Sequence, residues 1–261
     1  MLHSKRFSIF DNKKDMRLET EFETTLHKLL DEVSTQHDSI KLAHHFSLFN
    51  NQAISSQQWQ TLHSVVPDSI IKALPKRQSS FFNGRLCAEQ TLIKLGESPR
   101  LNIGKLKQPI WPNGVIGSIS HCDGMALAIA TSQMNIHGIG IDIESILDSK
   151  TLNAIRQSAL SEDERNRIPD WKQDIGLCEN TLVTVIFSLK ESFYKSVFNY
   201  VNRVLEFNAI EVINITAQKV EFIIKEQSVL ESLIQQDVIQ GIHLQGHYDL
   251  QENHTITCVI I

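Results

Sequence analysis

Residues 138–144 read Gly-Ile-Gly-Ile-Asp-Ile-Glu and contain the residue types best suited to chemistry in this chain. If the segment is a strand, alternation places its isoleucines on one face and its glycines, Asp142 and Glu144 on the other. Glycine inside a strand often marks the close approach of a ligand or another backbone. Two carboxylates at i and i+2 repel each other unless a cation lies between them, and oxygen-rich sites suit Mg²⁺, which also binds substrate phosphates. The segment therefore indicates either a magnesium site that holds phosphate or a strand end that runs into solvent.

A second candidate is Glu191, which lies in the helical pattern of residues 181–198. One stripe of this pattern is apolar, and aromatic residues flank Glu191 on the opposite side. A carboxylate beside packed rings needs a partner. That partner is either Lys195, as an i,i+4 ion pair, or a bound metal, in which case Glu191 is a third metal ligand or a general base.

Residues 118–122, Ser-Ile-Ser-His-Cys, close a predicted strand and precede a turn. Adjacent strand residues point to opposite faces, and no Gly-x-Ser-x-Gly elbow is present, which disfavours a Ser/His or Cys/His nucleophile. His121 beside the hydroxyl of Ser120 is better suited to hydrogen-bonding a phosphate, with a capped turn as the alternative. No glycine-rich Walker or Rossmann loop occurs, which argues against ordinary nucleotide hydrolases and dehydrogenases.

The charge distribution favours a small anionic ligand. The chain has 25 Lys and Arg against 30 Asp and Glu, a formal charge of −5, yet residues 76–107 contain seven basic and two acidic residues. Nucleic acid binding is typical of a broadly basic surface, so we expect no nucleic acid partner. A solvated helix face is the plain alternative for the basic stretch.

Composition and apolar patterning narrow the class of protein. The 261 residues, 41% hydrophobic and 21% charged, are typical of a folded globular chain of one large or two small domains. No apolar run approaches the length of a membrane span. Charged residues interrupt the N-terminus before any apolar core of a secretory signal develops, so we expect a cytoplasmic protein. The four widely spaced cysteines suggest neither a zinc site nor a disulfide framework, and we expect reduced, mostly buried thiols.

Hydrophobic periodicity predicts the elements that must position these residues. A helix is expected over about residues 76–95, after Pro75, and two more over 152–160 and 181–198. The predicted strands are 115–120, 125–131, 136–144, 209–216, 220–225, 241–248 and 255–261. Residues up to about 51 have no clear period, and no repeat or linker is apparent. Helices mixed with short, hairpin-linked strands indicate an α+β fold.

Four segments in order resemble motifs of the 4′-phosphopantetheinyl transferases, in particular the enterobactin synthase component D branch. They are Phe81-Phe-Asn-Gly-Arg85, Pro109-Ile-Trp-Pro112 with Gly117-Ser-Ile-Ser-His121, Gly138-Ile-Gly-Ile-Asp-Ile-Glu144, and Phe187-Ser-Leu-Lys-Glu-Ser-Phe-Tyr-Lys195. Together they cover residues 81–195. In the last motif this chain has Phe187 where relatives often have tryptophan.

The resemblance implies two similar, pseudo-twofold-related α+β lobes, residues 1–131 and 132–261, with coenzyme A in the cleft between them. It implies transfer of the phosphopantetheine arm of coenzyme A to a serine of an apo carrier protein, with release of adenosine 3′,5′-bisphosphate. The carriers would be peptidyl, aryl or acyl carrier proteins, most closely those of non-ribosomal peptide synthesis of siderophores such as enterobactin. The enzyme would be a cytoplasmic, Mg²⁺-dependent monomer.

The same resemblance implies roles for individual residues. Metal-binding acids are Asp142, Glu144 and Glu191. Lys195 is implied to lie near the phosphates and the catalytic centre, where Glu191 is also the candidate base. Residues that contact coenzyme A are Arg77, Arg85, Ser120, His121 and Lys195. Lys76 is a further candidate beside Arg77, since the spacing of the basic residues upstream of the Gly-Arg pair varies in the family. Glu164, in Ser161-Glu-Asp-Glu164, is a candidate for a further acid of the family pattern.

Two other functions compete with the transferase. One is a coenzyme A or carrier-protein binding module that has lost its chemistry. The other is a different Mg²⁺-dependent enzyme that acts on a phosphorylated small molecule. Neither explains why the four motifs occur in this order.

Overall fold

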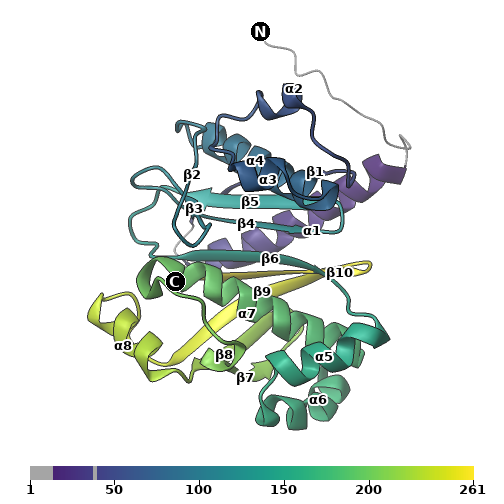
Figure 1. Cartoon of the computed structure of the whole chain (residues 1–261). Helices are drawn as coiled ribbons and strands as arrows, with labels where there is room; N and C mark the ends of the chain where they lie inside the picture. The colour runs from purple at the N-terminus through teal and green to yellow at the C-terminus, as the bar shows by residue number, and fades with distance from the viewer. Residues whose placement is uncertain (1–13, 38–39) are drawn as a thin grey trace.

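Two antiparallel sheets organise the computed structural model, which describes residues 14–37 and 40–261 (Figure 1). The smaller sheet has the strand order β1-β5-β4, with β1 at Ala43–Leu48, β4 at Ile116–Cys122 and β5 at Met125–Thr131. The larger sheet has the order β6-β10-β9-β8-β7. Its strands are β6 (Ile139–Ser145), β7 (Ile210–Ile215), β8 (Lys219–Ile224), β9 (His243–Gln251) and β10 (His254–Ile260). A short hairpin pairs β2 (Asn102–Ile103) with β3 (Pro109–Ile110).

Two long helices cover these sheets and confirm the α+β expectation. Helix α4 (Pro75–Lys94) packs on the smaller sheet, and α7 (Glu179–Val201) packs on β6 and β10 of the larger one (Figure 1). Pro75 occupies the first turn of α4, where its missing N–H costs no helical hydrogen bond. The remaining helices are α1 (Lys14–Gln36), α2 (Ser56–Trp59), α3 (Asp68–Ile71), α5 (Ser149–Ala159), α6 (Glu162–Ile175), α8 (Gln227–Gln235) and a 3₁₀ turn at Phe207–Ala209.

Strand β6 has the alternation that the sequence predicts. Its isoleucines lie in the core, whereas Gly138, just before the strand, and Gly140 within it face α7. A Cβ atom at either glycine would collide with the backbone carbonyl of Ser196 or Ser192. The predicted close approach is therefore made by a helix backbone, and it brings α7 against the strand that contains both acids.

Helix α1 lies in the region for which the sequence showed no clear period. Its residues Phe22, Leu26, Leu29, Leu30 and Val33 are buried at helical spacing. They share one core with Leu127 and Ile129 of β5 and with isoleucines of β6 and β10. This core therefore contains residues of both sheets. The division between residues 131 and 132 remains a prediction.

Several other expectations can be compared with the described residues. Strand β6 begins at Ile139, three residues later than the predicted start at 136. Helices α6 and α8 were not predicted from the sequence. Helix α6 lacks a clear signal because it is strongly polar and contains Pro169. Residues 1–13, which include most of the charges used to exclude a secretory signal, lie outside the described part. Within that part, no helix is long and apolar enough to span a membrane. The four cysteines are free thiols, of which Cys87 and Cys258 are buried.

Candidate active site

A pocket lies where the start of α4, the β4–β5 turn and the end of β6 meet. It has a volume of about 490 Å³ and is lined by Leu74, Lys76, Arg77, Ser80, His121, Cys122, Asp123 and Glu144. Both sheets contribute strands to it, β4 from the smaller and β6 from the larger. The predicted site residues Arg77, His121 and Glu144 thus come together, as does Lys76, although they are distant in sequence.

Asp142 lies on β6, two residues before the pocket residue Glu144, in a dense set of hydrogen bonds. It is 3% exposed. Its Oδ1 accepts from Nζ of Lys195 at 2.6 Å and from the Ser120 hydroxyl at 2.8 Å, while Oδ2 accepts from Ser188 at 2.8 Å. Nζ of Lys195 also donates to the backbone oxygen of Ile141 at 3.0 Å. The ion-pair partner of Lys195 is therefore Asp142 on β6. This corrects the alternative interpretation in which Lys195 pairs with Glu191, four residues earlier on the same helix.

Glu144 and Glu191 lie in a region with too little positive charge. Burial raises the pKa of Glu144 to about 8, and the nearby Asp142 and Glu191 raise it further, while Lys195 opposes them. Burial also raises the pKa of Glu191, again with a contribution from Asp142 against Lys195. One ammonium does not balance three carboxylates in a desolvated place. Such a site favours an additional proton or a cation.

The donor set of these acids fits a hard cation that is shared with phosphates. All the candidate donors are carboxylate oxygens, which suits Mg²⁺. Among the residues that the structure describes, no three acidic, histidine or cysteine side chains already converge on one point. Mg²⁺ is usually held by one or two carboxylates together with waters and substrate phosphates. The arrangement therefore fits a metal that completes its coordination on the substrate.

His121 is half-buried against α4 and borders the pocket. Burial lowers the pKa of His121, and the charges of Lys195 and Arg77 lower it further. Gly84 of α4 lies against this strand: a Cβ atom there would be crowded by Cγ2 of Ile119 at 3.1 Å and in ordinary contact with Cδ2 of His121 at 3.8 Å. A neutral imidazole placed in this way is suited to hydrogen-bonding a phosphate.

Two predicted ligand-binding residues lie deeper than the pocket. Arg85 is 4% exposed; its Nη1 donates to the backbone oxygen of Asn102 at 3.3 Å, and its guanidinium lies 5.2 Å above the Phe81 ring. Burial lowers the pKa of Arg85 to about 10. Ser120 is also buried, and its hydroxyl already serves Asp142 and Lys195. Contact of these two residues with a ligand phosphate remains a prediction.

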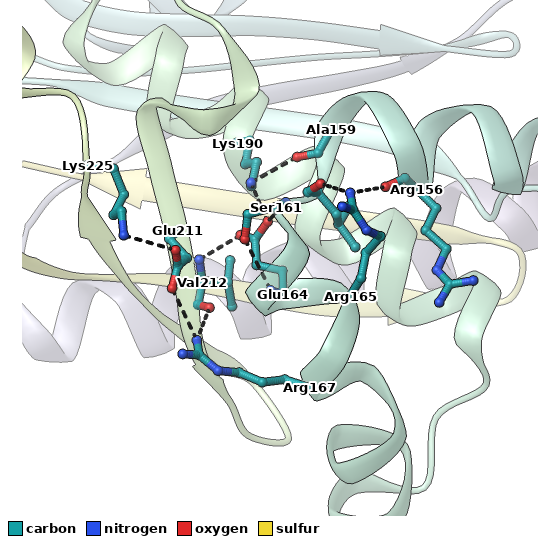
Figure 2. Close-up of polar contacts among 11 residues, drawn as sticks. Arg156, Ala159, Ser161, Glu164, Arg165, Arg167, Lys190, Glu211, Val212 and Lys225 are labelled. Carbon is teal, nitrogen blue, oxygen red and sulfur yellow. Dashed lines mark hydrogen bonds and ion pairs between the residues drawn. The ribbon is translucent and has the colours of Figure 1, made fainter.

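Glu164 belongs to a separate polar cluster, drawn in Figure 2. Its Oε2 accepts from the Ser161 backbone N–H and from Nζ of Lys190, both at 2.7 Å, and its Oε1 accepts from the Val212 N–H at 2.7 Å. Nζ of Lys190 also donates to the Ala159 carbonyl at 2.9 Å. Glu164 thereby joins α6 to α7 and β7, and it does not line the pocket.

Several residues of the site were missed by the sequence reasoning. The hydroxyls of Ser188 and Ser192 on α7 both hydrogen-bond Thr257 on β10, and Ser188 also supports Asp142. Serines at positions 188, 192 and 196 recur every four residues. This row of small residues, together with the two glycines before and in β6, is a signal of close helix-to-strand packing. No comparable signal marked Leu74, Ser80, Cys122 or Asp123 as pocket residues.

Comparison with known proteins identifies the superfamily of the chain. Residues 67–131 match the family model of the 4′-phosphopantetheinyl transferase N-terminal domain, and residues 138–259 match that of the 4′-phosphopantetheinyl transferase superfamily. An enterobactin synthase component D of Salmonella typhimurium is 32% identical over 184 residues, which cover 70% of this chain and 75% of that protein. The chain belongs to the 4′-phosphopantetheinyl transferase superfamily.

Other members of the superfamily match shorter parts of the chain. Enterobactin synthase component D of Escherichia coli K12 is 37% identical over 121 residues, 46% of this chain and 55% of the relative. The 4′-phosphopantetheinyl transferase Npt of Nocardia iowensis is 38% identical over 103 residues, 36% of this chain and 46% of the relative. Both superfamily models include pocket residues, since the N-terminal one spans α4 and β4 and the other spans β6 and α7.

Proposed function

We propose that this chain transfers the 4′-phosphopantetheine arm of coenzyme A to a serine of an apo carrier protein and releases adenosine 3′,5′-bisphosphate. The observation that carries this proposal is the pocket in which basic residues at the start of α4 meet the acidic end of β6. Membership of the superfamily defines the reaction class, and the relatives named enterobactin synthase component D point to carriers of non-ribosomal siderophore synthesis. The cytoplasmic location, the monomeric state and the two-lobe boundary after residue 131 belong to the same proposal.

The basic wall of the pocket binds the phosphates of coenzyme A in this proposal. Lys76 and Arg77 are exposed in the first turn of α4, and His121 supplies a ring nitrogen beside them. Lys76 forms an exposed ion pair with Asp123 at 3.3 Å, which a phosphate can replace at little cost. These residues hold the diphosphate next to the carboxylates.

Mg²⁺ would be held by Glu144 with Asp142 and Glu191, and when bound it neutralises charge on the diphosphate. The ammonium of Lys195, fixed by Asp142 and the Ile141 carbonyl, lies ready to stabilise charge that develops on the departing phosphate oxygen. In this proposal the acids hold the cation, and the lysine stabilises the leaving group.

Glu191 accepts the proton of the carrier serine in this mechanism. Its raised pKa makes it a stronger base than an exposed glutamate once it is ionised. The serine oxygen bonds to the phosphorus that bears the pantetheine, and the bond from that phosphorus to the bridging oxygen breaks. The electron pair leaves with adenosine 3′,5′-bisphosphate. The serine proton passes to Glu191 directly or through a water.

The direct test is to incubate the protein with coenzyme A, Mg²⁺ and a panel of apo peptidyl, aryl and acyl carrier proteins. Intact mass spectrometry should detect the phosphopantetheine increment, and a chelator should abolish it. Asp142→Asn and Glu191→Gln should abolish transfer while the fold persists, whereas Asp163→Asn, an exposed acid of α6, should not change it.

Two outcomes would change the assignment. Binding of coenzyme A without transfer to any carrier would favour the non-catalytic binding module. Turnover of another phosphorylated substrate with Mg²⁺, in the absence of any carrier modification, would favour a different enzyme. Near-normal transfer by Glu191→Gln would remove this residue from the mechanism without removing the function.

A further inference from the structure

The free edge of β6 is unusual because it is buried without a neighbouring backbone ladder. In the part of the chain that the structure describes, strand β6 is the edge of the larger sheet and pairs with β10 on one side only. On its other side it packs against β4 of the smaller sheet (Figure 1). Buried backbone N–H groups must find acceptors. Atoms of β4 must therefore accept from the N–H groups on this edge of β6.

Side chains of β4 take the place of backbone carbonyls. Oγ of Ser118 accepts from the Ile141 N–H at 3.0 Å, and Oγ of Ser120 accepts from the Ile143 N–H at 3.2 Å. Sγ of Cys122 accepts from the Ser145 N–H at 3.2 Å. Each bond joins residues 23 positions apart, so the two strands run in constant register. These three bonds form a side-chain ladder between the sheets.

The two ends of the side-chain ladder have different surroundings. Ser118 is buried and does not line the pocket. Cys122 lines the pocket, and its Sγ also hydrogen-bonds the Ser145 hydroxyl at 3.2 Å. That hydroxyl donates to Asp123 at 2.9 Å, and Asp123 pairs with Lys76. The Cys122 rung thus connects the acidic strand to the basic wall of the pocket.

The acids lie between the rungs of this ladder. Asp142 falls between Ile141 and Ile143, and Glu144 falls between Ile143 and Ser145. Because β4 and β6 belong to different sheets, the rungs determine how far Glu144 lies from the residues that α4 and β4 contribute. Loss of the Cys122 rung would release the end of β6 next to Glu144, whereas loss of the Ser118 rung would loosen the opposite end.

We propose that Cys122 is a positioning residue, whose thiol acceptor holds the end of β6 so that Glu144 and the basic wall of the pocket bind one ligand together. The proposal rests on the proposed function, since that ligand is coenzyme A. It assigns Cys122 a role as a hydrogen-bond acceptor and not as a nucleophile. The thiol is suited to this role, because burial raises the pKa of Cys122 to about 11 and keeps it protonated.

Three variants separate the acceptor from the shape of the side chain. Cys122→Val fills similar space but can neither accept nor donate a hydrogen bond, whereas Cys122→Ser keeps both abilities in a smaller side chain. Ser118→Ala removes the rung at the far end and is the matched control. Amide hydrogen exchange by NMR reports each rung directly, and calorimetric titration with coenzyme A and Mg²⁺ reports binding without any carrier protein.

The expected pattern is specific to the end of the ladder. In Cys122→Val, which removes the thiol's hydrogen bonds to both the N–H and the hydroxyl of Ser145, the Ser145 amide should exchange faster. The Kd for coenzyme A should rise at least about fivefold, the size of one net hydrogen bond. The KM for coenzyme A should rise similarly while kcat changes less than about twofold, and Cys122→Ser should restore both. Ser118→Ala should speed exchange of the Ile141 amide and lower the Tm, with the Kd unchanged.

Three results would overturn the proposal. In the first, the Ser145 amide exchanges faster in Cys122→Val but the Kd is unchanged, so that the rung is only structural. In the second, Ser118→Ala raises the Kd as much as Cys122→Val, so that the effect is general destabilisation. The third is a failure of the unaltered protein to bind coenzyme A, which would overturn the proposed function as well, so the two failures are distinguishable.

Discussion

Two lysines on α7 pair with carboxylates, but their surroundings differ. The side chains of Lys190 and Glu164 are 1% and 0% exposed, and backbone groups of three elements complete their hydrogen bonds (Figure 2). The side chains of Lys195 and Asp142 are 25% and 5% exposed, and uncompensated acids lie beside them. A closed pair of this kind fixes helices in place, whereas the pair beside the pocket still has charges that a ligand can satisfy. The same helix thus holds both kinds of pair, five residues apart.

The largest effect on stability is expected from breaking the closed pair. Lys190→Met keeps the side-chain volume but leaves the buried charge of Glu164 without its cation, which should cost about 3–5 kcal/mol of unfolding free energy. Urea denaturation measures this loss, with exposed Lys172→Met as the control. A loss below about 1 kcal/mol would mean that the backbone N–H groups alone suffice for Glu164.

Breaking the Lys195–Asp142 pair beside the pocket should affect the transfer rate more than the stability. Lys195→Met should lower the transfer rate about 10²–10³-fold, the size of a lost electrostatic stabiliser. Its stability loss should be smaller than that of Lys190→Met, because Asp142 keeps the hydroxyls of Ser120 and Ser188. Parallel rate and denaturation measurements on both variants check the contrast. Equal stability losses with little change in rate would make the two pairs equivalent.

A smaller effect is expected from the pH dependence of Glu144. The pKa of Glu144 is raised to about 8 in the folded protein, whereas the ordinary pKa of glutamate is near 4.5. Between these two pH values the folded state therefore keeps a proton that the unfolded state releases. This stabilising contribution is present below the ordinary pKa and is lost as the pH rises through about 8. The unaltered protein should therefore lose stability between pH 5 and pH 8, and Glu144→Gln should lose less. Denaturation of both proteins at the two pH values, without divalent cations, measures this difference. An identical difference at both pH values would contradict the raised pKa.

The smallest effect on stability is expected at the exposed edge of the pocket. Lys76 and Asp123 form a surface ion pair, so Lys76→Ala should change the unfolding free energy by less than about 0.5 kcal/mol. The affinity for coenzyme A should nevertheless fall severalfold, since the lysine faces the pocket. Calorimetry of Lys76→Ala beside Lys72→Ala, an exposed lysine that does not line the pocket, provides the comparison. Equal affinities of the two variants would remove Lys76 from the site.

Local patterns explain why parts of the site could be predicted. The alternation of residues 138–144 is a property of the strand itself, so the burial of its isoleucines followed from the sequence. Proline at the start of α4 and the apolar stripe of α7 are equally local signals. The motif resemblance added that residues of four separate segments belong to one site, which no single segment indicates by itself.

The unpredicted features depend on contacts between distant segments. The partner of Lys195 lies 53 positions away, so helical spacing alone favoured the wrong partner for its ammonium. Glu164 could be placed in the Ser161 capping box from the sequence, but its bonds to Val212 and Lys190 required the folded arrangement of three elements. The pocket positions of Cys122 and Asp123 likewise depend on how the two sheets meet.

The pairing of β6 with β10 also constrains when the chain can fold during its synthesis. Ile139 pairs with Ile260, so the strand that contains Asp142 and Glu144 gains the one paired strand it has among the described residues far downstream. Closing so long a loop is slow, and an unpaired strand edge exposed in the meantime is prone to aggregation. A ribosome-bound chain that lacks residues 254–260 lacks the strand that pairs with β6, so we expect ligand binding to begin only after β10 has emerged and folded.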